Sequence, residues 1–319
     1  MSFAGPPGRA EAWLAPDAGF ELDSFKISGF PRRPGPSLLR ALGEAVAAPL
    51  ACGKILEQRR PDVVLGGGSY AGGPMALAAW RRHIPAAVME ADAHLGLANR
   101  LALPFVRRVF LSFPIPGREG GKYRVVGRPV RRIPAPSSEE ARRLFELPES
   151  GPVLLVFGGS QGSLALNELA VDAFGEAGPA VLHLCGSRYF DRLRDRVGRA
   201  DYRLLPWTDD FSAALAAADL VLARAGGSVW EVAAAGKPAV LVPSPNVTAD
   251  HQTQNARYFA ERGGAILVPE TELGTVPKLL RSLLGDERRR RELAEAMHAL
   301  ARPDAADEIA GELIALARA

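Results

Sequence analysis

Short apolar runs alternate along the chain with longer stretches in which apolar residues recur every three to four positions. Runs of valine and leucine bounded by polar residues are typical of strands buried in a parallel sheet, and the stretches between them fit amphipathic helices. The pattern predicts an α/β protein built from βαβ units. The expected strands are 62–65, 86–89, 109–113 and 123–126 in the first half and 153–157, 180–184, 202–205, 220–223, 239–242 and 265–268 in the second. Helices are expected at 167–174, 228–235, 250–262 and 287–301.

The chain divides into two predicted domains, because 319 residues exceed one ordinary hydrophobic core. Proline and serine punctuate residues 134–151 like a linker, so we place the boundary near Ile133. The first domain is then 1–133 and the second 134–303. Pro303 ends the last helix of the second domain, and residues 304–319 are expected to form a terminal helix that packs back on the first.

The composition is that of a globular protein, with 47% hydrophobic and 24% charged residues. Cys52 and Cys185 are too few for a disulfide framework, and their apolar settings predict buried thiols in a reducing compartment. No run approaches the roughly 20 apolar residues that span a bilayer, and the first residues lack a signal-peptide pattern. We therefore expect a cytoplasmic protein.

Charge is unevenly distributed. Residues 1–149 contain 21 Lys+Arg against 14 Asp+Glu, a net +7, whereas residues 150–319 contain 18 against 22, a net −4. A basic half attracts nucleic acid, a phosphorylated substrate or an anionic membrane surface. Aromatic residues are not interleaved with the basic clusters, which disfavours nucleic acid as a partner.

Two glycine-rich loops each follow an expected strand and precede a helix. They are 66–74 (GGGSYAGGP) and 158–163 (GGSQGS). Glycine allows close approach of the backbone to a ligand, and the following helix N-terminus favours an anion such as a diphosphate. Neither loop has the spacing of the dinucleotide or mononucleotide phosphate motifs, so NAD and ATP chemistry are disfavoured. The alternative is that the glycines only form tight turns.

A third loop, 224–231 (RAGGSVWE), follows the strand at 220–223. Ser228 and Glu231 have the spacing of a capping box, which would make both purely structural. The other interpretation is that Glu231 binds a ribose diol through charge-assisted hydrogen bonds. Further along, Gln252 and Asn255 lie three apart on one helix, so their amides suit sugar hydroxyls, whereas Asp250 and His251 could be a helix cap and a surface residue.

Taken together, these segments resemble the MurG family of glycosyltransferases. GGSQG at 158–162, RAG at 224–226 with Glu231, and DHQTQNA at 250–256 resemble its donor-domain signatures. In the first half, ISG at 27–29, PDVVLG at 61–66, GGP at 72–74, Glu90, GL at 96–97, Asn99 and GRPVR at 127–131 follow in the family's order. The resemblance covers nearly the whole chain.

The resemblance implies two Rossmann-like domains facing a cleft, the GT-B arrangement. It also implies transfer of N-acetylglucosamine from UDP-N-acetylglucosamine to a polyprenyl-diphosphate-linked muramyl pentapeptide, the conversion of lipid I to lipid II in peptidoglycan synthesis, by an inverting displacement. The enzyme would be peripheral on the inner face of the cell membrane. No cofactor or tightly bound metal is implied.

Residue roles also follow from the resemblance. Ser160 and Arg131 would contact the diphosphate region, and Ser228 a phosphate. Gln161 and Gly226 of the same signatures would also bind substrate. Thr208 would offer backbone to the uracil, and Glu231 would bind the ribose. Gln252 and Asn255 would hold N-acetylglucosamine, and Asn99 would line the cleft.

The chain departs from the family in the first domain. It begins on what resembles the end of a strand, so the family's first glycine loop, GGTGGH, and the histidine that serves there as candidate base are expected to be missing with one strand and one helix. The catalytic base is thus unassigned, with Asp92, where the family has Asn, and His94 as candidates. Gly226 and Glu231 are also separated by one residue fewer than in some members.

Two rival functions stay open: a UDP-N-acetylglucosamine 2-epimerase of similar architecture, and a catalytically silent nucleotide-sugar-binding or scaffold protein. The stretch 31–60 has its own alternatives, because its apolar residues could face either the domain core or a membrane. Those residues are Leu38, Leu39, Leu42, Val46 and Leu50, and the surrounding basic residues are Arg32, Arg33, Arg40, Lys54, Arg59 and Arg60.

Overall fold

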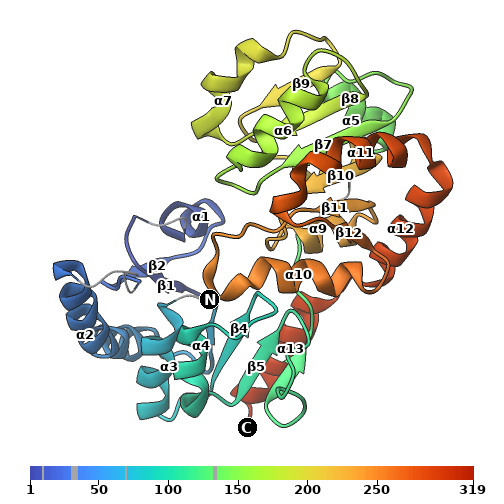
Figure 1. Ribbon diagram of the computed structural model, residues 1–319. Coiled ribbons are helices and arrows are strands. Elements are labelled where there is room, and N and C mark those ends of the chain that lie inside the picture. The colour runs from blue at the N-terminus through green and yellow to red at the C-terminus, as the bar shows by residue number, and fades with distance from the viewer. Residues whose placement is uncertain (9–10, 30–34, 69, 132–134) are drawn as a thin grey trace. The chain divides into compact units, whose positions relative to one another are not determined.

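The computed structural model describes residues 1–8, 11–29, 35–68, 70–131 and 135–319. These residues form two compact units (Figure 1). Unit 1 is Met1–Val126 with Asp307–Ala319, and unit 2 is Gly127–Ala306. Both are built on parallel strands, which confirms the predicted α/β class. The proposed boundary at Ile133 and linker residue Pro134, together with Ser69, Arg32 and Arg33, lie outside the described residues.

Unit 2 contains a six-stranded parallel sheet in the order β12-β11-β10-β7-β8-β9. Four strands have the predicted bounds: β7 (Val153–Phe157), β8 (Ala180–Leu184), β9 (Tyr202–Leu205) and β10 (Leu220–Ala223). The others, β11 (Ala239–Leu241) and β12 (Ala265–Leu267), end one residue earlier than predicted. Strand order reverses between β7 and β10, and in open parallel sheets ligands bind outside the carboxyl ends of the strands at such a reversal.

Helices on both faces bury this sheet. Valine and leucine side chains from β7, β8 and β10 pack against α6 and α11 in one core cluster. The helical segments of unit 2 are α5 (Ser138–Leu144), α6 (Leu164–Phe174), α7 (Ser187–Leu193), η2 (Arg194–Arg196), α8 (Phe211–Ala217), α9 (Val229–Ala234), η3 (Thr248–Asp250), α10 (His251–Ala260), η4 (Glu270–Thr275), α11 (Val276–Gly285) and α12 (Glu287–Ala299).

Unit 1 contains two parallel sheets. The first pairs β1 (Phe3–Gly5) with β2 (Leu22–Ser24), joined through α1 (Glu11–Asp17). The second has the order β3-β4-β5-β6. Its strands and the remaining helices are β3 (Val64–Gly66), β4 (Ala86–Glu90), β5 (Arg108–Leu111), β6 (Tyr123–Val125), α2 (Pro36–Arg59), α3 (Gly72–Arg81), α4 (Leu97–Ala102) and η1 (Leu103–Phe105).

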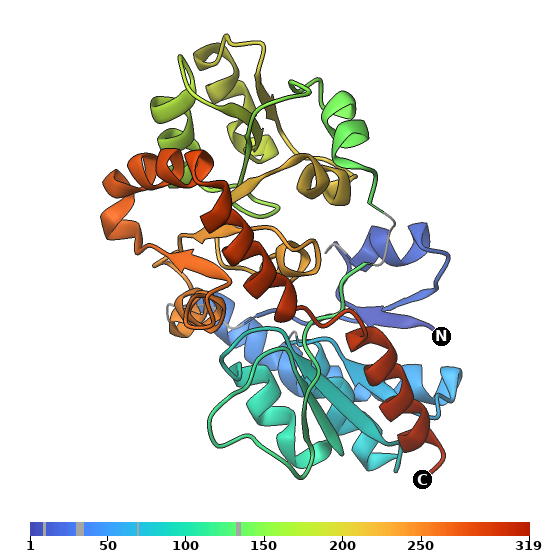
Figure 2. The same cartoon turned by 90° about the vertical axis from the view of Figure 1, so that its right-hand side faces the viewer.

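The C-terminal helix α13 (Ala305–Ala317) packs on the β3–β6 sheet of unit 1 (Figure 2). Ile309 and Leu316 are buried against Phe110 and neighbouring apolar residues of that sheet. Glu312 adds an ion pair at 2.7 Å to Arg108 of β5. The chain therefore contributes its last helix to the unit formed by its first residues.

Candidate functional site

Two predicted loops meet where the strand order of unit 2 reverses. β7 pairs directly with β10, and Phe157 lies opposite Ala223 at their carboxyl ends. The loop 158–163 follows β7 and the loop 224–228 follows β10, so the pairing places the two loops side by side. The structure thus brings together two segments that the sequence separates by about 60 residues.

Arg224 ties these loops to a third segment of the unit. Its side chain is buried, and its Nε donates to Ser163 Oγ at 2.9 Å. Its Nη1 donates to the carbonyl oxygens of Val242 and Pro243, at 3.1 and 3.0 Å, in the loop after β11. An ion pair with Glu270 of η4 neutralises the guanidinium charge. Arg224 is therefore a structural clamp, a role that its place in the RAG signature did not indicate.

Glycines permit a close contact between the loops after β7 and β8. Gly162 has φ +69, and a Cβ there would overlap the carbonyl oxygen of Cys185. Gly186 has φ +88, and its Cβ would stand 2.8 Å from the Gly162 backbone. Asn167 of α6 secures the contact by donating from Nδ2 to the Cys185 carbonyl at 2.8 Å. These glycines therefore have a packing role between the two loops.

A buried polar network continues below Asn167. Its Oδ1 lies 3.0 Å from His183 Nε2, and His183 Nδ1 lies 2.8 Å from the Tyr202 hydroxyl. Because Asn167 Oδ1 can only accept, Nε2 donates and Nδ1 accepts from Tyr202. Complete burial lowers the pKa of His183 to about 3, so the imidazole is neutral. This histidine is a structural residue of the core.

Both cysteines are buried free thiols, as predicted. Burial raises the pKa of Cys52 to about 12 and that of Cys185 to about 11. Thiolate formation is therefore suppressed, and neither thiol suits nucleophilic chemistry at neutral pH.

The tips of the two loops are exposed. Ser160 and Gln161 are exposed side chains at the tip of the first loop, and a Cβ on Gly226 would meet no atom within 4 Å. Ser163 accepts from Leu166 N at the start of α6, so its hydroxyl caps the helix that follows the first loop. Ser228 precedes α9 without making a side-chain cap hydrogen bond. The capping-box interpretation of Ser228 and Glu231 is therefore wrong.

Glu231 is a half-buried carboxylate in the first turn of α9. Burial raises its pKa, and the positive charge of Arg128 partly opposes this rise. A carboxylate in such a position can accept two hydrogen bonds from a ligand, and the low local dielectric makes those hydrogen bonds stronger than they would be in water.

The start of α10 separates two residues that the spacing paired. Gln252 is half-buried, and its Oε1 accepts from Ser244 N at 2.9 Å. Asn255 is completely buried and donates from Nδ2 to the Ala225 carbonyl at 3.0 Å. Asn255 therefore fixes the loop after β10 to α10. Asp250 makes no side-chain cap for α10, so the capping alternative for Asp250 is also wrong; its carboxylate accepts instead from Thr253 Oγ1 at 2.6 Å.

Two further predicted residues lie in irregular segments of unit 2. Thr208 follows β9, is half-buried, and its Oγ1 accepts from Asp210 N at 3.1 Å. Arg131 is exposed near the start of the unit.

In unit 1, the predicted residues gather around Glu90 at the end of β4. This buried carboxylate accepts from Gly96 N at 2.8 Å and from Asn99 Nδ2 at 2.9 Å, and weakly from Asp92 N at 3.3 Å. Asn99 is buried and also donates to the Met89 carbonyl at 3.0 Å. Asp92 and His94 are half-buried in the loop that Glu90 holds in place. Glu90 is thus an organising residue to which the sequence assigned no role.

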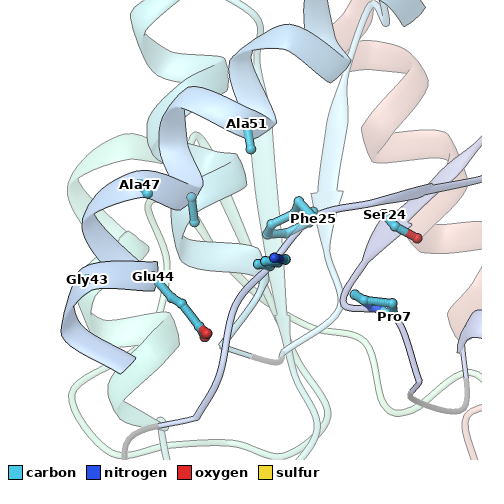
Figure 3. A pocket seen from close by; sticks show the side chains of 9 residues that line it. Pro7, Ser24, Phe25, Gly43, Glu44, Ala47 and Ala51 are labelled. Carbon is cyan, nitrogen blue, oxygen red and sulfur yellow. The ribbon is translucent and has the colours of Figure 1, made fainter. Parts of the chain in front are cut away.

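A separate pocket of about 640 Å³ lies elsewhere in unit 1 (Figure 3). It is lined by α2 on one side and by Pro7 and the segment Ser24–Lys26 on the other. Glu44 lines it and accepts from Ser28 Oγ at 2.6 Å and Arg40 Nε at 3.0 Å, which holds the pKa of Glu44 below its usual range. None of the predicted site residues lines this pocket.

Among the described residues, no group of three or more His, Cys, Asp or Glu side chains could hold a metal ion. Across the same residues, none of the helices combines the length and the apolar character needed to cross a bilayer.

Comparison with protein families matches both halves of the chain. Residues 3–111 match the glycosyltransferase family 28 N-terminal domain, and residues 153–309 match its C-terminal domain. A similar protein from Halorhodospira halophila is 40% identical over 94% of this chain and 86% of its own length. It is called UDP-N-acetylglucosamine--N-acetylmuramyl-(pentapeptide) pyrophosphoryl-undecaprenol N-acetylglucosamine transferase.

Solved structures give a consistent result. The crystal structure of Acinetobacter baumannii MurG is 27% identical, with a TM-score of 0.77 over 98% of this chain and 90% of that one. A Neisseria meningitidis UDP-GlcNAc 2-epimerase bound to UDP-GlcNAc is 14% identical with a TM-score of 0.66, over 98% of this chain and 91% of that one, a likeness of fold alone.

The buried His183 predicts an acid-sensitive unit 2. In the unfolded chain a histidine binds a proton below about pH 6.5, whereas folded His183 remains neutral until about pH 3. Stability from this group is therefore complete above pH 6.5 and falls by about 1.4 kcal/mol per pH unit as the pH decreases from 6.5 towards 3. On unfolding between pH 6.5 and 5, the wild type takes up a proton at His183 that the His183→Gln variant cannot take up. We therefore expect the unfolding free energy of His183→Gln to fall less steeply with decreasing pH, by about 1.4 kcal/mol per pH unit. Equal pH dependence in both proteins, measured by urea unfolding, would contradict this assignment.

Proposed function

Since the chain belongs to the MurG family of glycosyltransferase family 28, we propose that it transfers N-acetylglucosamine from UDP-N-acetylglucosamine to a polyprenyl-diphosphate-linked muramyl pentapeptide, converting lipid I to lipid II in peptidoglycan synthesis. The observation that supports this proposal is that the paired strands β7 and β10 place the loops 158–163 and 224–228 side by side at the strand reversal, with Glu231 in the first turn of the helix that follows the second loop. A nucleotide sugar suits that arrangement because both a diphosphate and a ribose find partners there.

The donor would lie along the carboxyl edge of the unit 2 sheet. Glu231 accepts from the ribose hydroxyls, and Thr208 offers its backbone to the uracil. The diphosphate interacts with Ser160, Gln161, Gly226, Ser228 and Arg131. Gln252 holds the sugar through its amide nitrogen, since its Oε1 already accepts from Ser244 N. The hydrogen bonds of Asn255 and Asn99 within their own units favour positioning roles for these two residues.

The reaction would be a direct displacement at the anomeric carbon. The muramyl 4-hydroxyl forms the new bond while the bond to UDP breaks, so the anomeric configuration inverts. The hydroxyl proton passes to a base, for which Asp92 and His94 are the candidates in the loop organised by Glu90. Negative charge that develops on the departing diphosphate is stabilised by the N-terminus of α6 and by Arg131.

A transfer assay tests this function against its two rivals. Radiolabelled UDP-N-acetylglucosamine is incubated with the protein in the presence and absence of lipid-linked muramyl pentapeptide. We expect labelled lipid only when the acceptor is present, and an intact donor when it is absent. Conversion of the donor to its 2-epimer without acceptor would favour the epimerase, and UDP binding without any product would favour the silent binder.

A membrane surface is the second proposed partner, and α2 supports it. Leu39, Val46 and Leu50 are 73%, 78% and 70% exposed, and Leu42 lies on the same stripe at 46%. The core-facing side of α2 consists instead of small residues with Cys52 and Leu56. The predicted alternative, in which these apolar residues face the core, is therefore wrong for this stripe. An exposed apolar stripe on a basic unit fits binding to the inner face of the cell membrane.

The charged rim of this stripe is weaker than the sequence suggested. Arg40 pairs with Glu44 at 3.0 Å, and Arg59 pairs with Asp23 at 2.8 Å and with Glu21. Lys54 and Arg60 are exposed at the C-terminal part of α2. Each cation near anionic lipid contributes about 1 kcal/mol, so apolar insertion and charge must act together.

We expect the protein to co-sediment with anionic vesicles at low salt and to be released at high salt. Val46→Ser with Leu50→Ser should weaken binding without unfolding, because both side chains are already exposed. Ile314→Ser, at a 52% exposed position of α13, is the matched control and should bind like the wild type. Equal recovery with neutral and anionic vesicles, or equal binding of both variants, would contradict the proposal.

A further inference from the structure

Arg128 lies directly on the loop that follows β10. Gly227 has no side chain, and a Cβ at that position would overlap the guanidinium of Arg128. The space that any other residue would fill is therefore occupied by the cationic end of this arginine. Both residues belong to unit 2, so the contact is internal to one compact body.

The residue before Arg128 sets the direction from which the arginine reaches the loop. Gly127 has φ +81, and a Cβ there would overlap the side chain of Arg302 and lie 3.5 Å from the ring of Trp230. Trp230 is buried in α9, next to Glu231. Gly127 thus packs closely against α9, the helix that contains Glu231. The next residue, Arg128, places its guanidinium against Gly227.

The charges around this loop leave Arg128 with a specific electrostatic role. The buried Arg224 is paired with Glu270 and donates to carbonyls, so its charge is already compensated. Glu231 is half-buried, and Arg128 is the cation whose charge favours its ionised form. A donor diphosphate on the same loop would add further negative charge close to that carboxylate, and the resulting repulsion grows as water is displaced.

We propose that Arg128 is a donor-binding residue whose guanidinium neutralises the diphosphate beside Glu231 and so allows both anions to share the loop after β10. The inference rests on the proposed use of a UDP-sugar donor. A guanidinium suits this role because it is always charged and its planar array of donors matches two phosphate oxygens at once.

Calorimetric titration with UDP and with uridine separates this role from a general structural one. Arg128→Met keeps the length of the side chain and removes the charge. We expect UDP affinity to fall about tenfold or more and uridine affinity to change less than about threefold, because uridine has no phosphate. The UDP affinity of Arg128→Lys should lie between that of the wild type and that of Arg128→Met. Arg288→Met, at an 88% exposed position of α12, is the charge-matched control and should titrate like the wild type.

A second background tests whether Arg128 acts between the two anions. In Glu231→Gln, the repulsion that Arg128 relieves is absent, so Arg128→Met should cost less UDP affinity there than in the wild type. An equal loss of UDP and uridine affinity in Arg128→Met, or no loss of either, would overturn the role of Arg128. A wild-type protein that binds neither ligand would overturn the proposed donor, and the inference with it. Gly227→Ala, which displaces the guanidinium but keeps its charge, should show the same selective loss of UDP affinity.

Discussion

The buried guanidinium of Arg224 is the interaction on which the arrangement of unit 2 depends. It donates hydrogen bonds to a hydroxyl in the loop after β7 and to two carbonyls in the loop after β11, and it forms an ion pair with a carboxylate in η4. A buried cation without such partners costs several kcal/mol, so the three segments must remain together for the unit to be stable. The exposed groups of the adjacent loops can therefore meet a ligand without first being ordered by it.

Smaller polar networks likewise hold loops in place. Asn167 joins the loop after β8 to α6 and accepts a hydrogen bond from the neutral His183. In unit 1, Glu90 gathers backbone and side-chain donors and fixes the loop that contains Asp92 and His94. Each network lies at the carboxyl end of a parallel strand, where catalysis and binding are usually found in this class of fold. Rigid support at these points provides the precise geometry that a two-substrate transfer requires.

How far the sequence predicted the structure depended on the kind of signal. Strands β7 to β10 were predicted to the residue. β7, β8 and β10 are fully buried runs of mainly apolar residues, and the partly buried β9 keeps a short run of tyrosine and leucine around Arg203. Strand β2 was not predicted, since its sequence LDS is not an apolar run and none of its residues is buried. Helix α1 was not predicted, since seven residues make only about two turns, too few for the helical period to emerge. The family and its fold followed from motifs that combine glycine positions with polar residues at fixed spacing.

Side-chain direction was the part that spacing could not supply. Gln252 and Asn255 lie three apart on one helix, yet one is half-buried and the other has no exposed surface. The serine and glutamate of a capping-box pattern did not form the box, because Ser228 makes no cap hydrogen bond. The central measurement is hydrogen–deuterium exchange with and without UDP. We expect added protection in residues 158–163, 224–231 and the first turn of α10, with no change around Glu90; protection absent from both loops after β7 and β10 would contradict the account.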